Sequence, residues 1–357
     1  MGKDVILVVK KVVFLAIVLL IIIGIGGYLM FSKQTYILIS PFFGGKDQTD
    51  RISSKIDTSL VLDLTKTKEL SPLENVPRYL VYNQDTGVVY YSKNTNVRMS
   101  PASFTKLLST QVVLDFVTPG DEITVSEKSI NKVPTVLGLK AGEKITVSDL
   151  LRGAIATSAN DAAQVLADGA TESVGIFPPE FIYYMNKKAT LLGMNHSHFV
   201  NPDGLDEQDQ YSTLEDVAKM VNNAQKNYPD ILSAAKSDNE DIATSSAHGR
   251  YYLPNWNGLL GVYPGVDGLK IAYTENAGYS TIVTAKRGKF SMIAIISGTD
   301  SYLERDRAAA DLLDAAFMAE GLPAIKVTTN QLNRRYKVWG DLARKIQAEL
   351  KLLNSIN

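Results

Sequence analysis

The heptapeptide SPASFTK, residues Ser100 to Lys106, places a hydroxyl and an amine three residues apart at the start of a predicted helix. Ser100 is a good N-cap and Pro101 suits the first helical position, so Ser103 should lie in the first turn, at the positive end of the helix dipole. Lys106 would share a helix face with Ser103. The residues that follow are mostly apolar, which predicts a buried helix.

Burial would change the chemistry of Lys106. A buried amine without a permanent counter-ion has a lowered pKa, and its neutral form is a base for the Ser103 hydroxyl. The alternative is a surface lysine whose stem covers a core helix while its charged end reaches water. The S-x-x-K pattern alone does not decide between them.

The composition excludes several classes of function. The chain has 357 residues, 45% hydrophobic and 21% charged, as expected of one large globular domain or two small ones. A net charge of -1 argues against nucleic acid as a partner. The absence of cysteine excludes disulfides, thiolate metal sites and cysteine nucleophiles. The three histidines form no H-E-x-x-H motif, so we predict no metal site.

The N-terminal region predicts a membrane anchor. Val12 to Phe31 is uncharged and mostly aliphatic, and about 20 helical residues cross a bilayer. Three lysines precede this stretch and one follows it closely, which predicts a cytoplasmic tail over 1–11, a single-pass anchor over 12–31 and an extracytoplasmic remainder. A cleaved signal peptide is the alternative, because small residues occur at 24–26, but the apolar run continues to Phe31.

Residues 32–75 lack sustained periodicity and are interpreted as a juxtamembrane spacer. From residue 76 to 322 we predict one folded domain. It starts with two β-rich runs around Asp85-Thr86-Gly87, a hairpin signal, and continues into a long helical middle.

The end of this domain predicts more strands. The runs GLKIAYT, GYSTIVTAK and FSMIAIIS read as an antiparallel meander, followed by a helix over about 302–319. Strands, then helices, then strands indicate an α+β fold in which an antiparallel sheet built from both ends of the domain is covered by helices.

The C-terminal extension, residues 323–357, carries an apolar stripe at helical spacing. An amphipathic helix there could pack on the domain or lie on a membrane surface, and the sequence leaves both open.

Two further motifs follow SPASFTK in the chain. Ser158-Ala159-Asn160 lies at a break between two helical stretches, where either polar residue could simply be a helix cap. Lys270 lies on a predicted strand, where a lone lysine is more often an edge charge. Penicillin-binding proteins and class A β-lactamases carry three motifs in this order. A serine is followed by a lysine one helical turn away, then comes an S-x-N motif, and last a lysine on a strand.

The segments around these motifs carry a closer resemblance. The blocks are NVRMSPASFTKLLST, GLKAGEKITVSDLLRGAIATSANDAAQVLAD, HFVNPDGLDEQDQYSTLEDVAKMV and PGVDGLKIAYTENAGYS. In order and spacing they resemble the serine D-alanyl-D-alanine carboxypeptidases, the low-molecular-mass penicillin-binding proteins of a peptidase family S11 type. The resemblance covers roughly residues 76–322.

This resemblance implies a β-lactamase/transpeptidase-like domain, here preceded by one transmembrane helix. It also implies that the partners are peptidoglycan stem peptides and, as covalent inhibitors, β-lactam antibiotics. The expected location is the bacterial cell membrane with an extracytoplasmic catalytic domain, and no cofactor is implied.

The resemblance also implies a role for each motif residue. Ser103 would be the acylated nucleophile and Lys106 the base that activates it. Ser158 would relay protons to the leaving amine, Asn160 would bind the substrate backbone and Lys270 would supply positive charge.

The strand motif departs from the family pattern of lysine, threonine or serine, and glycine. Ile271 lacks the hydroxyl that would bind the terminal carboxylate of the substrate, a contact worth roughly 1.5 to 3 kcal/mol. Ala272 adds a methyl group where glycine would let the substrate lie close, and we expect both changes to face the substrate. The backbone N–H of Tyr273 is the implied second oxyanion donor, beside that of Ser103.

Three functions follow from this pattern. An active carboxypeptidase, or an endopeptidase with altered specificity, keeps all the acylation residues. A catalytically inactive wall-binding relative would explain Ile271 and Ala272. A β-lactamase ranks last, because no E-x-x-L-N-like stretch follows Asn160.

Overall fold

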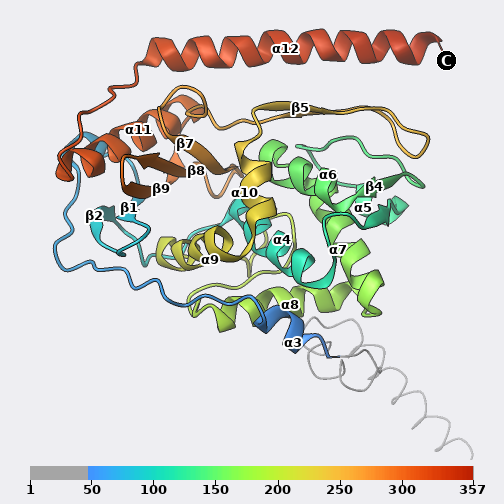
Figure 1. Ribbon diagram of the computed structural model, residues 1–357, viewed down its shortest axis with the longest axis horizontal. Coiled ribbons are helices and arrows are strands. Elements are labelled where there is room, and N and C mark those ends of the chain that lie inside the picture. Colours follow the sequence, from blue (N-terminus) through green and yellow to red (C-terminus); the bar gives the residue numbers. More distant parts are fainter. Residues whose placement is uncertain (1–46, 357) are drawn as a thin grey trace, which may run out of the picture.

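The computed structural model describes residues 47–356 and is built around a five-stranded antiparallel sheet in the order β2-β1-β9-β8-β7 (Figure 1). Its strands are β1 (Arg78–Asn83), β2 (Val89–Lys93), β7 (Val266–Ala272), β8 (Tyr279–Arg287) and β9 (Phe290–Thr299). The predicted hairpin and meander are confirmed, and the pairing of β1 with β9 joins the two ends of the domain.

The remaining elements cover this sheet or extend from it. In chain order they are α3 (Thr49–Ser53), η2 (Ser71–Leu73), η3 (Ala102–Phe104), α4 (Thr105–Phe116), β3 (Glu122–Thr124), α5 (Glu127–Ile130), β4 (Lys144–Thr146), α6 (Val147–Arg152), η4 (Gly153–Thr157), α7 (Asn160–Val174), α8 (Pro178–Leu191), α9 (Leu214–Asn227), α10 (Pro229–Lys236), β5 (Asn239–Ile242), β6 (Tyr251–Pro254), α11 (Tyr302–Ala319) and α12 (Thr329–Ile356).

The sheet separates two hydrophobic cores, because neighbouring residues of a strand point to opposite faces. Ile282 and Ile295 pair across β8 and β9 and belong to the larger core, with the helical cluster of α4 and α7 to α9. Val283 and Ala294 pair one step along and belong to the smaller core, with α11. The expected α+β arrangement of a helix-covered antiparallel sheet is therefore confirmed.

The described part of the predicted spacer, residues 47–75, lies against the domain. Ile52 is fully buried, and Lys55 donates a hydrogen bond to the Leu114 carbonyl at 3.1 Å. Asp57 accepts a hydrogen bond from Asn222 at 2.8 Å. These contacts fix this stretch to α4 and α9, so it is not a free tether.

The C-terminal extension contains the expected helix, α12, which runs along one side of the molecule (Figure 1). Leu332 and Trp339 are buried, and the Trp339 ring meets that of Trp256 edge to face at 5.8 Å. The first half of α12 is thus packed on the domain.

The predicted anchor, Val12 to Phe31, lies outside the described residues. Among residues 47–356, no helix combines the length and the apolar character that a bilayer crossing requires.

Candidate active site

Ser103 and Lys106 lie together at the start of α4. The Lys106 amine is 2.9 Å from the Ser103 hydroxyl oxygen. Ser103 lies in the 3₁₀ turn η3, where side chains three residues apart eclipse one another, and the α-helix begins two residues later at Thr105. Ala102, directly before Ser103, has a φ of 44°, a strained value for a residue with a Cβ.

The predicted N-cap was wrong. The Ser100 hydroxyl does not cap the helix but donates a hydrogen bond to the Asp206 carboxylate at 2.7 Å. Asp206 also accepts from the Thr274 hydroxyl at 2.8 Å. The S-x-x-K turn is therefore tied by a long-range contact to the β7–β8 turn, which replaces the local cap.

Lys106 is completely buried, so the alternative of a lysine reaching water was wrong. Its amine binds three neutral oxygens, namely those of the Ser103 hydroxyl, the Asn160 side-chain amide at 2.7 Å and the Asp203 main chain at 2.5 Å. Burial lowers the pKa of Lys106 to about 7. A substantial share of these amines is then uncharged near neutral pH.

Asn160 is positioned by the break between α6 and α7. A π-helical turn, η4, ends at Thr157, and the next residue, Ser158, has a left-handed φ of 65° and is buried. The Asn160 amide nitrogen donates to the Val133 carbonyl at 2.9 Å while its oxygen faces Lys106. Neither Ser158 nor Asn160 caps α7 with its side chain. Both ends of the Asn160 amide are occupied, which orients the lysine.

Lys270 lies on the edge strand β7 but is only 1% exposed, so it is not a surface charge. Its amine donates to the Ile271 carbonyl at 2.9 Å. Burial, with the positive charges of Lys106 and Arg305, holds the pKa of Lys270 well below its usual range. The charge of Lys106 therefore influences the pKa of Lys270.

Ile271 and Ala272 do not share a direction. Lys270 pairs with Ile282, so Lys270 and Ala272 lie on the face of the helical cluster, and Ile271 lies on the opposite face. Ala272 is fully buried, whereas Ile271 is partly exposed. Successive residues of a strand alternate, so on this edge strand the partly exposed Ile271 side chain is available to a ligand, whereas the Ala272 methyl group is buried. Tyr273 is 50% exposed, and its ring lies 4.4 Å from that of Tyr279.

The structure adds residues that the motifs did not indicate. Asp203 supplies the main-chain oxygen on Lys106, and its carboxylate pairs with Lys132 at 2.8 Å. Gly204 has a φ of 87° and lies so close to η3 that a Cβ there would meet the Ala102 carbonyl oxygen at 1.9 Å. The Pro-Asp-Gly turn signal at 202–204 was visible in the sequence, but its contact with Lys106 was not.

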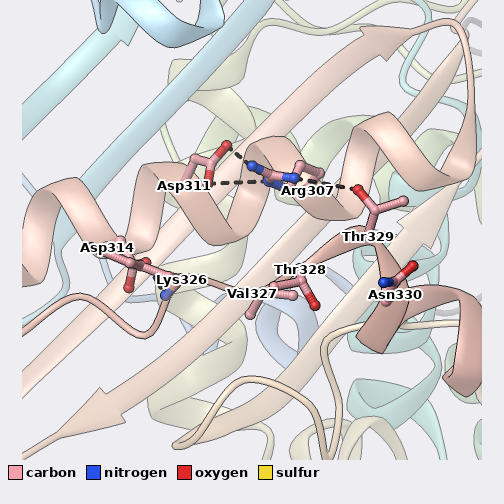
Figure 2. A pocket seen from close by; sticks show the side chains of 8 residues that line it. All are labelled: Arg307, Asp311, Asp314, Lys326, Val327, Thr328, Thr329 and Asn330. Atoms are coloured by element: carbon pink, nitrogen blue, oxygen red, sulfur yellow. Dashed lines mark hydrogen bonds and ion pairs between the residues drawn. The ribbon is translucent and has the colours of Figure 1, made fainter.

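A cavity of about 480 Å³ lies elsewhere, between α11 and the start of α12 (Figure 2). Arg307 pairs with Asp311 one turn along α11 and donates a hydrogen bond to the Thr329 hydroxyl at the start of α12. Asp314 accepts two backbone N–H groups from the segment before α12. None of its lining residues belongs to the three motifs. Within residues 47–356 no cluster of His, Asp or Glu could hold a metal ion.

Comparisons with known proteins agree with this arrangement. Residues 67–301 match the sequence model of the D-alanyl-D-alanine carboxypeptidase family, peptidase S11. The chain is 34% identical over 260 residues to D-alanyl-D-alanine carboxypeptidase DacF of Bacillus subtilis, covering 71% of this chain and 65% of that protein. It is 29% identical to DacA of Escherichia coli, over 69% of this chain and 62% of that one.

Solved structures give the same result. The Streptomyces K15 DD-transpeptidase superimposes with a TM-score of 0.62 at 28% identity, over 68% of this chain and 97% of that one. The cefotaxime-bound penicillin-binding protein D2 of Listeria monocytogenes gives 0.59 at 27% identity, over 68% and 97%.

This chain belongs to the D-alanyl-D-alanine carboxypeptidase family S11, the low-molecular-mass penicillin-binding proteins, and has their transpeptidase-like fold. It spans 65% and 62% of the length of the two curated relatives named above.

Proposed function

We propose that this protein is a serine-type D-Ala-D-Ala carboxypeptidase that trims peptidoglycan stem peptides through an acyl-serine intermediate. The observation that carries this proposal is the buried Lys106 amine, 2.9 Å from the Ser103 hydroxyl and bonded only to neutral oxygens. Family membership supports the substrate class.

In the proposed acylation, the neutral Lys106 amine takes the proton of the Ser103 hydroxyl. The serine oxygen then attacks the carbonyl carbon of the penultimate D-alanine. The C–N bond to the terminal D-alanine breaks, and the leaving nitrogen receives a proton relayed through Ser158. Water hydrolyses the resulting ester and restores the hydroxyl. No metal or organic cofactor takes part.

Electrostatic stabilisation would come from the turn and the edge strand. The backbone N–H groups of Ser103 and Tyr273 are the proposed oxyanion donors, and a donor of this kind is worth about 3 to 4 kcal/mol. Asn160 orients Lys106 through its oxygen, and we propose that its nitrogen exchanges Val133 for the substrate backbone. Lys270 would supply positive charge when the substrate carboxylate is bound, because a facing negative charge favours the ammonium form and opposes the effect of burial on its pKa.

The location proposed for this chemistry is the outer side of a bacterial cytoplasmic membrane. The uncharged stretch Val12 to Phe31 and the lysines before it support a single-pass anchor with the catalytic domain outside.

A fluorescent penicillin tests the acylation step. We expect a covalent adduct on Ser103, located by mass spectrometry, and release of D-alanine from a peptide ending in D-Ala-D-Ala. The Ser103→Ala variant should give neither. An adduct without D-alanine release would favour an endopeptidase, which cross-linked muropeptides would reveal. Loss of both signals in the parent protein would favour a wall-binding relative.

Substitution of Ile271 tests the substrate end of the site. Ile271→Thr restores a β-branched hydroxyl at the edge strand, and one hydrogen bond to a carboxylate should raise carboxypeptidase kcat/KM by about tenfold or more. Ile271→Val is the matched control, because it shortens the side chain without adding a donor. If the threonine variant is no faster than the valine variant, position 271 does not bind the carboxylate.

A further inference from the structure

An ion pair between Lys132 and Asp203 adjoins Lys106, and neither residue belongs to the three motifs. The Lys132 amine is 2.8 Å from the Asp203 carboxylate, whose side chain is fully buried while that of Lys132 is 19% exposed. The main-chain oxygen of the same aspartate binds the Lys106 amine. The negative charge of the buried Asp203 carboxylate favours the ammonium form of Lys106.

We propose that the Lys132–Asp203 ion pair is a positioning device that keeps Lys106 uncharged, with Lys132 neutralising the carboxylate of the residue that holds the base in place. This inference rests on the function proposed above, and it adds two residues outside the three motifs to the acylation machinery.

The aspartate cannot turn away from the site. Its carboxylate accepts the Leu205 backbone N–H at 3.1 Å, and the Asn201 side chain accepts that of Gly204 at 2.8 Å. Gly204 lies against the Ala102 carbonyl, where no Cβ would fit. The loop is thus fixed on the turn that carries the nucleophile, so the Asp203 charge keeps its distance from Lys106 when its partner is removed.

Lys132 comes from a loop that is also fixed. The carbonyls of Val133 and Thr135 accept the side chain and the backbone of Asn160, at 2.9 and 2.7 Å. Asp161 accepts the backbone N–H of Leu137 at 2.9 Å. The same loop therefore positions the neutralising cation and Asn160, the side chain that orients Lys106.

Besides burial, three charged groups influence the pKa of Lys106. Asp203 and Asp161 favour its ammonium form, while Lys132 disfavours it. Lys132 forms its ion pair with Asp203, at 2.8 Å, whereas Asp161 is bound by the backbone N–H groups of Leu137 and Gly138, so Asp203 carries the charge that Lys132 opposes. Removal of Lys132 should therefore raise the pKa of Lys106, and removal of the Asp203 charge should lower it.

Removing the charge of Lys132 and removing that of Asp203 should thus shift the pKa of Lys106 in opposite directions. A purely structural role of the pair would not produce opposite shifts. In the pH profile of the acylation rate, we expect Lys132→Gln to shift the acidic limb to higher pH by about one unit. At pH values below that limb the rate should then be about tenfold lower than in the parent. Asp203→Asn keeps the main-chain oxygen and should move the limb downward. The double variant should return close to the parent profile.

The measurement is the second-order rate of acylation by a fluorescent penicillin between pH 5 and 9, corrected for the folded fraction. Lys128→Gln is the matched control, because it removes the same charge from the exposed surface of α5, and its profile should equal that of the parent. Lys132→Arg keeps the positive charge at this position, so its pH profile should equal that of the parent.

A second measurement does not depend on turnover. The titration of Lys106, followed by NMR of ε-¹³C-lysine and assigned with Lys106→Met, should shift upward in Lys132→Gln and downward in Asp203→Asn. Shifts in the same direction, or no shift in folded variants, would overturn the inference. An absent Ser103 adduct with opposite NMR shifts would instead refute the proposed function alone.

Discussion

Two lysines of this protein, Lys106 and Lys188, are equally buried and differ only in what surrounds them. Both are fully inaccessible to solvent. The Lys188 amine lies 2.7 Å from the Asp115 carboxylate and 2.6 Å from the Tyr228 hydroxyl. The Lys106 amine has neutral oxygens at the corresponding places.

The difference teaches that burial alone does not make a base. Burial lowers the pKa of both lysines, but at Lys188 the facing charge of Asp115 opposes this shift. Lys188 also donates to the Ile52 carbonyl at 3.2 Å, so it joins α8, α4 and the segment around α3. One lysine is placed for proton transfer, whereas the other holds three elements together.

Exchange of each lysine for methionine should separate these two roles. Lys106→Met removes the base while keeping an apolar side chain of similar length, and we expect acylation to fall about 10²- to 10⁴-fold. Lys188→Met should leave the rate per folded molecule within about threefold of the parent. Rates are measured with a fluorescent penicillin, and folded fractions by circular dichroism. Equal losses in the two variants would contradict the comparison.

For stability we expect Lys188→Met to have a large effect, although its effect on the acylation rate is small. Lys188→Met leaves Asp115 as an unpaired buried charge, which typically costs about 3 to 5 kcal/mol of the free energy of unfolding. Replacement of both partners, as Lys188→Met with Asp115→Leu, should recover much of this loss. Urea unfolding at pH 7 gives both values. A single variant as stable as the parent would show that the pair does not join these elements.

The sequence predicted one of these sites and not the other. Alternating runs predicted the hairpin and the meander, and the three-residue spacing brought Ser103 and Lys106 together as expected. Local patterns of this kind suffice because a strand or a single helical turn fixes neighbouring side chains by its own geometry. Nothing local distinguishes Lys188 from a surface lysine on a helix.

The parts that sequence reasoning missed depend on contacts between distant segments. Ser100 has the pattern of an N-cap, but Asp206 takes its hydroxyl because the loop after Gly204 packs on η3. The pairing of Asp203 with Lys132 has no signature in either segment. By contrast, the opposite directions of Ile271 and Ala272 follow from strand alternation alone and could have been predicted.

The pH dependence of stability sharpens the comparison further. An unfolded lysine titrates near 10.4, whereas folded Lys106 titrates at about 7, so between these values the unfolded state binds one more proton than the folded state. The free energy of unfolding should therefore rise with pH in this window, by up to about 1.4 kcal/mol per pH unit. Burial of Lys106 is a cost that is largest below pH 7 and disappears as pH approaches 10.4.

The contribution of Lys106 is isolated by subtraction, because Lys270 and Lys188 also have lowered pKa values and add slopes of their own. We expect urea unfolding between pH 7.5 and 8.5 to give a steeper rise in the parent than in Lys106→Met. Lys188→Met should retain more of the parent slope than Lys106→Met, since the Asp115 carboxylate opposes the lowering of the Lys188 pKa by burial. Parallel slopes in the parent and Lys106→Met would mean that Lys106 stays charged when folded, which would remove its distinction from Lys188.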